Sequence, residues 1–394
     1  MTSINKKVCC EVCDECSWHL LPWAESGPSV TTSGMIVDAS LGKGQCNSCG
    51  VVQRLTTELL GQGTFYTQNY HTYFSRVGAE TFDRSRYAAT AMWMKSSLGK
   101  FCPQNIADVG CGRGWTMKEM SLLFPDTPIT GIEPSEEDAR LASENGFDII
   151  TSTLEAAMST VGTFDLIYCN NVIQHSLSPR KFLSNLMQIV SDNGLIVLTC
   201  PDVTRPSNEM MWSDQNFSLA PVHLFKLASD VGLHVLSWQM PPSLVNLANK
   251  QLIIASKDSR IPFTFCSGDP PSFSISENIE ERNQYLEGWQ SLDNYLCQSV
   301  SDKTAVYNFG ASMWSYLLRG YCPKYWQKVD ACVIDEFSGQ FMDKAVMPYQ
   351  GIEFTRKDAV VLGTEPLNQP SLEQTLRDRC LAASIITWNQ IVPQ

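Results

Sequence analysis

The sequence predicts an α/β protein with a small cysteine-rich part at the N-terminus followed by two α/β units. Three observations support this prediction. Six of the 15 cysteines lie within residues 1–49. Strand-like apolar segments alternate with helical patterns over residues 105–257, and a second strand–glycine–helix pattern begins at residue 304. We therefore expect four segments, which are residues 1–65, residues 66–257, a linker and long helix over 258–303, and residues 304–394.

The overall composition limits the class of partner. The chain has 394 residues, a formal net charge of −12 and 43% hydrophobic residues, which is enough for folded cores. No dense Lys/Arg run is present, whereas proteins that bind nucleic acid phosphates commonly present a basic face. The N-terminus lacks the apolar stretch of a signal peptide, and no segment approaches the ~20 apolar residues of a membrane span. We expect a cytoplasmic protein that acts on a small molecule, with no nucleic acid and no membrane partner, and the sequence does not predict its oligomeric state.

The N-terminal cysteines have the spacing of a zinc ribbon. Cys46 and Cys49 form a C-x₂-C pair that follows an earlier group of cysteines at zinc-ribbon distance. In that earlier group, either Cys10 with Cys13 or Cys13 with Cys16 has the same spacing, and we favour Cys13 and Cys16. Clustered cysteines in a reducing compartment favour metal over disulfides. Because four thiolates make a closed site, the predicted zinc is structural.

Residues 105–115, NIADVGCGRGW, predict a buried strand that ends in a tight turn. Gly110, Gly112 and Gly114 alternate with other residues, and glycine allows positive φ angles and close approach of a ligand. The following residues, WTMKEMSLLF, have apolar side chains at helical spacing. A strand, a glycine turn and a helix in this order are typical of a nucleotide-binding βαβ unit.

Two acidic residues flank this turn and indicate which nucleotide it binds. Asp108 precedes the first glycine, and the next strand-like segment, PITGIE, ends at Glu133. An acid at the end of the second strand can bind both hydroxyls of a ribose. The pattern D-x-G-x-G-x-G resembles S-adenosylmethionine (SAM)-dependent methyltransferases of the doubly wound class, whereas NAD fingerprints read G-x-G-x-x-G. The resemblance places Asp108 near the methionine ammonium and Glu133 on the ribose, and a similar domain that binds no SAM is the alternative.

The remaining strands and helices of this segment follow in order. Residues 164–175, FDLIYCNNVIQH, resemble the fourth-strand segment of the same methyltransferases, which places Asn170 among the cofactor-binding residues, and we interpret His175 as a packing residue. Residues 178–194 and 220–232 predict helices that end at glycines. The segments GLIVLTC, GLHVLSWQ and KQLIIASK complete the predicted sheet.

The C-terminal third predicts a linker, a helix and a second α/β unit. Residues 259–274 are rich in proline and serine, and residues 275–300 predict one long helix. Residues 304–321, TAVYNFGASMWSYLLRGY, predict a strand, a turn and a helix, and DACVIDE predicts the next strand. Ser312 replaces a glycine that a dinucleotide would need in this turn, so we expect neither NAD nor a second SAM here.

Taken in order, these segments resemble the C-methyltransferases that act on nucleotide-linked keto-sugars in deoxysugar biosynthesis. NYHTYFS at 69–75 resembles the tyrosine-rich segment before the SAM domain of that family, and AVYNFGASMWSYLL resembles its C-terminal domain. The resemblance implies an N-terminal zinc ribbon, a class I Rossmann-like SAM methyltransferase domain and a second Rossmann-like C-terminal domain that completes the sugar site. It also implies SAM and a structural Zn²⁺ as cofactors and a nucleotide-sugar as the substrate.

Methyl transfer to a carbon beside a ketone requires a base and a partner for the enolate oxygen. The resemblance makes His223 the best candidate for the base, and Tyr70 and Tyr73 candidates for binding the substrate or enolate. His71 is a further candidate for a catalytic residue. The family commonly has a glutamate directly before the histidine, whereas this chain has Val222 before His223. Two other functions stay open, which are an O- or N-methyltransferase acting on a small metabolite and an inactive SAM-binding or zinc scaffold protein.

Overall fold

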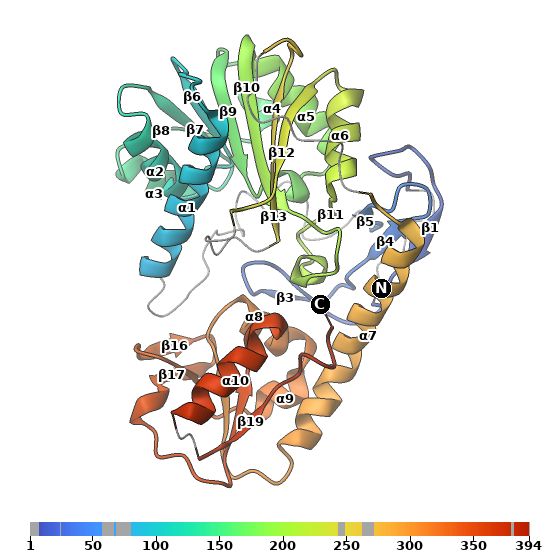
Figure 1. The fold of residues 1–394 in the computed structure, drawn as a ribbon, viewed down its shortest axis with the longest axis vertical. Coiled ribbons are helices and arrows are strands. Elements are labelled where there is room, and N and C mark those ends of the chain that lie inside the picture. The colour runs from blue at the N-terminus through green and yellow to red at the C-terminus, as the bar shows by residue number, and fades with distance from the viewer. Residues whose placement is uncertain are drawn as a thin grey trace.

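The computed structural model describes residues 8–23, 25–56, 67, 80–242, 249–261, 272–379 and 382–393. Two α/β parts lie at opposite ends of the molecule, and a long helix, α7, runs along one side (Figure 1). We call the described residues within 8–56 the ribbon, those within 80–261 the central part, and those within 272–393 the C-terminal part. Across these ranges, no helix is long and apolar enough to cross a membrane.

A seven-stranded sheet forms the central part, with the strand order β12-β13-β10-β9-β6-β7-β8. Its strands pair in parallel except β13, which runs antiparallel between β10 and β12. The chain first builds from β6 towards β8 and then returns to the other side of β6, and ligands of such sheets bind at the carboxyl ends of the strands beside this reversal. The doubly wound fold expected from the sequence is confirmed. The strands are β6 (Ile106–Val109), β7 (Ile129–Glu133), β8 (Asp148–Thr151), β9 (Phe164–Asn170), β10 (Val190–Pro201), β12 (His234–Gln239) and β13 (Lys250–Ser256).

Serine side chains cap two helices of the central part. Ser135 caps α3 and Ser178 caps α5, each by accepting a hydrogen bond from a backbone N–H in the first turn. The helix expected over residues 178–194 is shorter than the sequence predicts and ends at Ile189, because Val190 already pairs with strand β9. The helices are α1 (Glu80–Leu98), α2 (Trp115–Leu123), α3 (Glu136–Glu144), α4 (Leu154–Ala157), α5 (Pro179–Ile189) and α6 (Pro221–Asp230).

The ribbon shares a sheet with the central part. Strands β1, β4 and β5 of the ribbon pair antiparallel, and the two-residue strand β11 (Phe217–Ser218) of the central part pairs with β5. This connection could not be predicted from the sequence, because two residues give no periodic pattern. The ribbon strands are β1 (Trp18–Leu20), β2 (Ser29–Val30), β3 (Ile36–Val37), β4 (Lys43–Cys46) and β5 (Val52–Arg54).

The C-terminal part contains a second α/β sheet, with the strand order β16-β17-β15-β14-β18-β19. All neighbouring strands are parallel except β16 and β17. Its strands are β14 (Val306–Phe309), β15 (Ala331–Ile334), β16 (Gly339–Phe341), β17 (Lys344–Pro348), β18 (Ala359–Leu362) and β19 (Ser384–Ile386), and its helices are α8 (Met313–Tyr321), α9 (Pro323–Lys328) and α10 (Gln369–Asp378). The second α/β unit expected from the sequence is confirmed.

Helix α7 (Ile275–Ser299) contacts all three parts, and it runs from the ribbon down along the C-terminal part (Figure 1). The guanidinium of Arg282 is buried and donates to two oxygen atoms of the ribbon and to the carbonyl oxygen of Val203 in the central part. Further along, Trp289 stacks on Trp314 in the core of the C-terminal part. The helix therefore holds the ribbon and both sheets in one arrangement.

Candidate functional site

The turn after β6 has the backbone conformation that its glycines allow. Gly110, Gly112 and Gly114 have φ angles of 76°, 52° and 77°, as the sequence predicts. A Cβ atom at Gly110 would lie 2.5 Å from Cγ2 of Val172, so this position has no room for a side chain. The turn leads into α2 at the carboxyl end of β6, where doubly wound sheets bind ligands.

Glu133 lies at the end of β7 and is tied to this turn. Its Oε2 accepts a hydrogen bond from the backbone N–H of Gly112 at 2.8 Å, and its Oε1 accepts one from Ser135 at 2.8 Å. Only 5% of Glu133 is exposed. Burial raises the pKa of this carboxyl to about 7, although the two amide hydrogen bonds act in the opposite direction. The carboxyl is therefore held in a fixed position beside the glycine turn.

Asp108 is the buried acid on the other side of the turn. It lies opposite Tyr168 of β9 in the sheet, and its Oδ2 has no hydrogen-bond partner among the residues that the structure describes. Burial raises the pKa of Asp108 well above its usual range, and the Tyr168 hydroxyl opposes that rise. A buried carboxylate oxygen without a partner is costly, so this atom is suited to receive a charged or polar ligand group.

Asn170 links the turn to the other side of the sheet. Its Nδ2 donates to Oγ1 of Thr116 at 3.4 Å, in the first turn of α2. Its Oδ1 accepts from Oγ1 of Thr199 at 2.7 Å and from Nζ of Lys250 at 3.2 Å. These partners come from α2, β10 and β13, so they fix the orientation of the amide at the carboxyl edge of the sheet.

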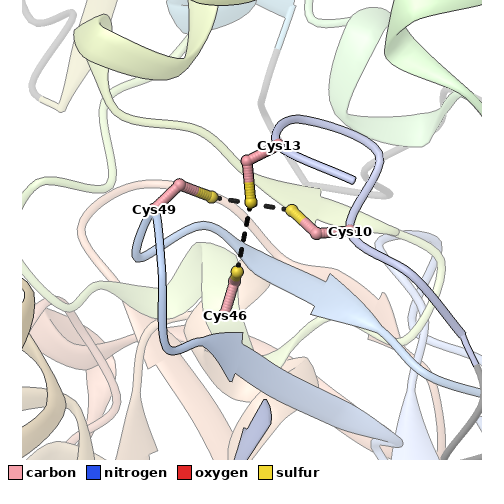
Figure 2. Close-up of side chains that lie close together, drawn as sticks. All are labelled: Cys10, Cys13, Cys46 and Cys49. Atoms are coloured by element: carbon pink, nitrogen blue, oxygen red, sulfur yellow. Dashed lines mark hydrogen bonds between the residues drawn. The ribbon is translucent and has the colours of Figure 1, made fainter. Parts of the chain in front are cut away.

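The ribbon brings four cysteines together, as Figure 2 shows for Cys10, Cys13, Cys46 and Cys49. Their sulfur atoms all lie within 4.8 Å of one another. The expectation that Cys16 belongs to this set is corrected, because Cys16 is exposed and forms a disulfide with Cys9 instead. The local turn begins at Cys10, whose carbonyl accepts from the backbone N–H of Asp14 and whose Sγ accepts from that of Val12. This turn directs Cys10 and Cys13 to the same side.

Residues 79–238 match the family model described as a methyltransferase domain. This part of the chain is a methyltransferase domain. The glycine turn, Glu133 and Asn170 all lie within the matched residues, whereas the four clustered cysteines and the C-terminal part lie outside them.

Two curated relatives match this chain at similar identity. The malonyl-[acyl-carrier protein] O-methyltransferase of Legionella pneumophila is 29% identical over 163 residues, which cover 40% of this chain and 53% of that protein. The trans-aconitate 2-methyltransferase of Rhodopseudomonas palustris is 29% identical over 112 residues, which cover 28% of this chain and 43% of that protein. The chain therefore spans about half the length of the curated relatives it matches. Among solved structures, the plantazolicin methyltransferase BpumL in complex with SAH is 17% identical, with 46% of this chain and 87% of that chain covered and a TM-score of 0.36.

His223 lies at the junction between the methyltransferase domain and the ribbon. Only 1% of it is exposed, its Nδ1 accepts from the backbone N–H of Ala220 at 2.9 Å, and its Nε2 lies 2.8 Å from the carbonyl oxygen of Cys49. Because Nδ1 is an acceptor, Nε2 carries the proton and donates to Cys49. Burial lowers the pKa of His223 to about 4. The expected role of His223 as the catalytic base is corrected, since neither nitrogen is available to take a proton from a substrate.

The other expected catalytic residues cannot be placed in this site. Tyr70, His71 and Tyr73 lie outside the described residues, so their role in the substrate site stays a prediction. His175, interpreted from the sequence as a packing residue, lies in the 3-10 helix η2 (Ile173–His175), and its Nδ1 lies 3.1 Å from the carbonyl oxygen of Asp214. Burial lowers the pKa of His175 below its usual range.

Two lysines, one buried and one partly buried, were not predicted as functional residues from the sequence. Lys43 of the ribbon is 1% exposed and donates to the carbonyl oxygen of Met210 at 3.0 Å. Lys250 is the first residue of β13 and contacts Asn170. Burial lowers the pKa of each lysine to about 7. A lysine at the start of an apolar strand is an ordinary sequence feature, so only the sheet register could reveal that Lys250 contacts Asn170.

Proposed function

We propose that this chain is a SAM-dependent methyltransferase that binds SAM at the glycine turn between β6 and α2. The observation that supports this function best is the turn itself, with Asp108 on one side and Glu133 on the other, inside a methyltransferase domain. Both acids are buried and held by the fold, as binding groups of a polar cofactor need to be. When bound, SAM supplies an electrophilic methyl group.

In this proposal, each residue of the turn has a distinct task. Glu133 accepts hydrogen bonds from the ribose hydroxyls, and Asp108 pairs with the methionine ammonium through its unpartnered Oδ2. The glycines let the cofactor approach the backbone. Asn170 holds the next strand end beside the cofactor. Because methyl transfer is an in-line displacement, such fixed positioning is the main contribution that a protein can make.

The methyl acceptor in this proposal is the α-carbon of a nucleotide-linked keto-sugar, on the basis of the family resemblance. Residues that follow the carboxyl end of β10, such as Met211 and Trp212, pack in one core with residues of the ribbon and of the C-terminal part. The three parts also follow one another along the chain in the order of that family. A second candidate is methyl transfer to oxygen, which the printed names of curated relatives favour, since one is a malonyl-[acyl-carrier protein] O-methyltransferase and another a ubiquinone biosynthesis O-methyltransferase.

We further propose that the four clustered cysteines hold one structural Zn²⁺. A tetrahedral zinc with Zn–S bonds of 2.3 Å has sulfur atoms about 3.8 Å apart. The Sγ atoms of Cys10 and Cys49 lie 3.5 Å apart, as do those of Cys13 and Cys46. Two of the sulfur pairs are therefore already close to the separation that a tetrahedral zinc sets. With all four positions taken by thiolates, such a site has no open position for catalysis.

An assay of methyl transfer tests the proposed function. The full chain is incubated with SAM carrying a labelled methyl group and a panel of nucleotide-linked keto-deoxysugars, and the product masses are measured. A product heavier by one labelled methyl group supports the proposal. In a second arm, the substrate is incubated in D₂O with the protein and SAH in place of SAM. Exchange of a carbon-bound proton of the substrate favours carbon as the methyl acceptor. If a substrate is methylated in the first arm but shows no such exchange, oxygen is favoured as the acceptor. Failure to bind SAH at all would contradict the proposal and leave a scaffold role.

A further inference from the structure

Lys250 lies at the edge of the central sheet where the proposed reaction takes place. In the sheet register Lys250 pairs with Pro201, the last residue of β10, so it stands at the carboxyl end of the parallel strands. Neighbouring strands are about 4.8 Å apart, and Lys250 is therefore two strands from β9 and three from β6. The side chains of Lys250 and Asn170 together bridge the two strand spacings between β13 and β9, so that Nζ lies 3.2 Å from Oδ1 of Asn170.

This position is on the acceptor side of the glycine turn. Glu133, the proposed ribose ligand, lies on β7, and the strands β6, β9, β10 and β13 follow in that order. A nucleoside held by Glu133 occupies the β7 side, so the molecule that receives the methyl group has to approach from the side of β9 and β10. Lys250 reaches over β10 towards that space, and unlike Lys43 it is only partly buried.

The partner of Lys250 leaves its amine free to accept a proton. Nζ has one hydrogen-bond acceptor, the neutral amide oxygen of Asn170, and no ion pair in the part of the chain that the structure describes. An amide oxygen stabilises an ammonium group less than a carboxylate does. A neutral amine can donate one N–H to Asn170 and still present its lone pair. The amide of Asn170 is itself fixed by Thr116 and Thr199.

Among the residues that the structure describes, the charged and titratable groups that act on Lys250 come from three elements. Arg86 of α1 disfavours the ammonium form, whereas Glu209 of the 3-10 helix η3 (Asn208–Met211) favours it. An ionised Cys200 of β10 would also favour the ammonium form. Burial raises the pKa of that thiol, however, so Cys200 is neutral near pH 7 and has no such effect. Desolvation outweighs these charges and lowers the pKa of Lys250 to about 7.

We propose that Lys250 is the general base that removes the proton from the methyl acceptor. This inference rests on the proposed function. The lone pair of Nζ takes the α-proton of the keto substrate, the C–H bond breaks, and its electron pair forms the enolate. The enolate carbon then attacks the methyl group of SAM, the C–S bond breaks, and its electron pair stays on sulfur in SAH. The ammonium of Lys250 finally releases the proton to water, so one proton leaves per methyl group transferred.

One test requires no substrate. The full wild-type chain is treated with acetic anhydride between pH 5 and 9, and the acetylation of each lysine is measured by mass spectrometry. We expect half-maximal reactivity of Lys250 near pH 7. Lys257 follows the opposite end of β13, away from Asn170, and serves as the internal comparison. A midpoint for Lys250 above pH 9 would overturn the proposal, because the amine would then be protonated at working pH.

A second test uses Lys250→Arg, Lys250→Met and the control Lys257→Met, assayed with the keto-sugar that gives product in the panel. Arginine keeps the charge but cannot take up a proton at neutral pH. The turnover of both Lys250 variants should fall by a factor on the order of 10² to 10⁴. Both variants should also lack the increase in activity that wild type shows as the pH rises through 7. Their SAH affinity and the activity of the control should stay within about threefold of wild type.

The outcomes separate the two proposals. If wild type binds SAH and methylates the sugar but Lys250→Arg keeps more than a third of its activity, Lys250 supplies charge at most and the proposal of a base is wrong. Retained deuterium exchange in Lys250→Arg with SAH and D₂O would lead to the same conclusion. If wild type neither binds SAH nor transfers a methyl group, the proposed function fails, whatever the acetylation of Lys250 shows.

Discussion

Nε2 of His223 donates a hydrogen bond to the carbonyl oxygen of Cys49 across a distance of 2.8 Å. This contact joins the first turn of α6 in the methyltransferase domain to the second cysteine pair of the ribbon. His223 also accepts from Ala220, so one imidazole satisfies two backbone groups that lie in the buried junction. The sequence motif that suggested catalysis therefore has a structural explanation in the attachment of the ribbon.

Replacing His223 by alanine should loosen this junction without weakening cofactor binding. The variant leaves the carbonyl of Cys49 and the N–H of Ala220 unpaired and opens a cavity, which together cost about 2–4 kcal/mol. We expect the melting temperature of His223→Ala to fall by on the order of 5–10 °C, with unchanged SAH affinity by calorimetry. His223→Gln keeps a donor for Cys49 and should recover part of the loss. Unchanged melting temperature with a large loss of turnover in both variants would restore the catalytic role.

The local features of the site could be predicted from the sequence because they depend on neighbouring residues. Gly110, Gly112 and Gly114 determine their own backbone angles, and a short apolar segment ending in Glu133 determines where β7 ends. Features that need contacts between distant segments could not be predicted. Arg282 and Lys250 obtain their roles only from the packing of α7 and the register of β13.

The choice between Cys10 and Cys16 shows a different limit. Both have C-x₂-C spacing to Cys13, so spacing alone favours neither. The turn that the backbone forms after Cys10 decides between them, through hydrogen bonds that have no signature in the cysteine pattern.

The cysteine cluster should hold one zinc per chain through Cys10. In Cys10→Ser, a thiolate ligand is lost and the site is incomplete, so metal analysis by mass spectrometry should find well below one zinc per chain. Cys16→Ser removes a cysteine of the same segment that lies outside the cluster and should keep the full zinc content. Cys46→Ser is the positive control, since both zinc-site interpretations include it. Loss of zinc in Cys16→Ser but not in Cys10→Ser would reverse the assignment.

The C-terminal part should bind neither NAD nor a second SAM. Nδ2 of Asn308 and Oγ of Ser315 both donate to the carbonyl oxygen of Gly310, at 2.7 and 3.0 Å. These side chains fill the turn between β14 and α8, where a pyrophosphate would otherwise meet the backbone. Calorimetric titration should therefore give one SAH per chain and no heat with NAD⁺. A stoichiometry of two SAH, or saturable NAD⁺ binding, would contradict this prediction.

The affinity for SAH should depend on pH through Glu133. Its pKa is about 7 in the free protein, because burial opposes the charged form. Ribose hydroxyls donate hydrogen bonds to the carboxylate, so binding favours the ionised form and lowers this pKa. Below pH 7 binding therefore has to release a proton, and affinity rises with pH until the carboxyl is already ionised.

Calorimetry between pH 5 and 8 measures this dependence. Affinity for SAH should weaken about tenfold for each pH unit below 7, or ~100-fold between pH 8 and pH 5. Glu133→Gln has no charge to gain, so its affinity should lack this pH dependence and should be ~10- to 100-fold weaker than wild type at pH 8. Asp148→Asn changes an exposed acid on the neighbouring strand β8 and should behave as wild type. If Glu133→Gln retained the wild-type pH profile, another group would control the titration, and the ribose contact of Glu133 would lose its main support.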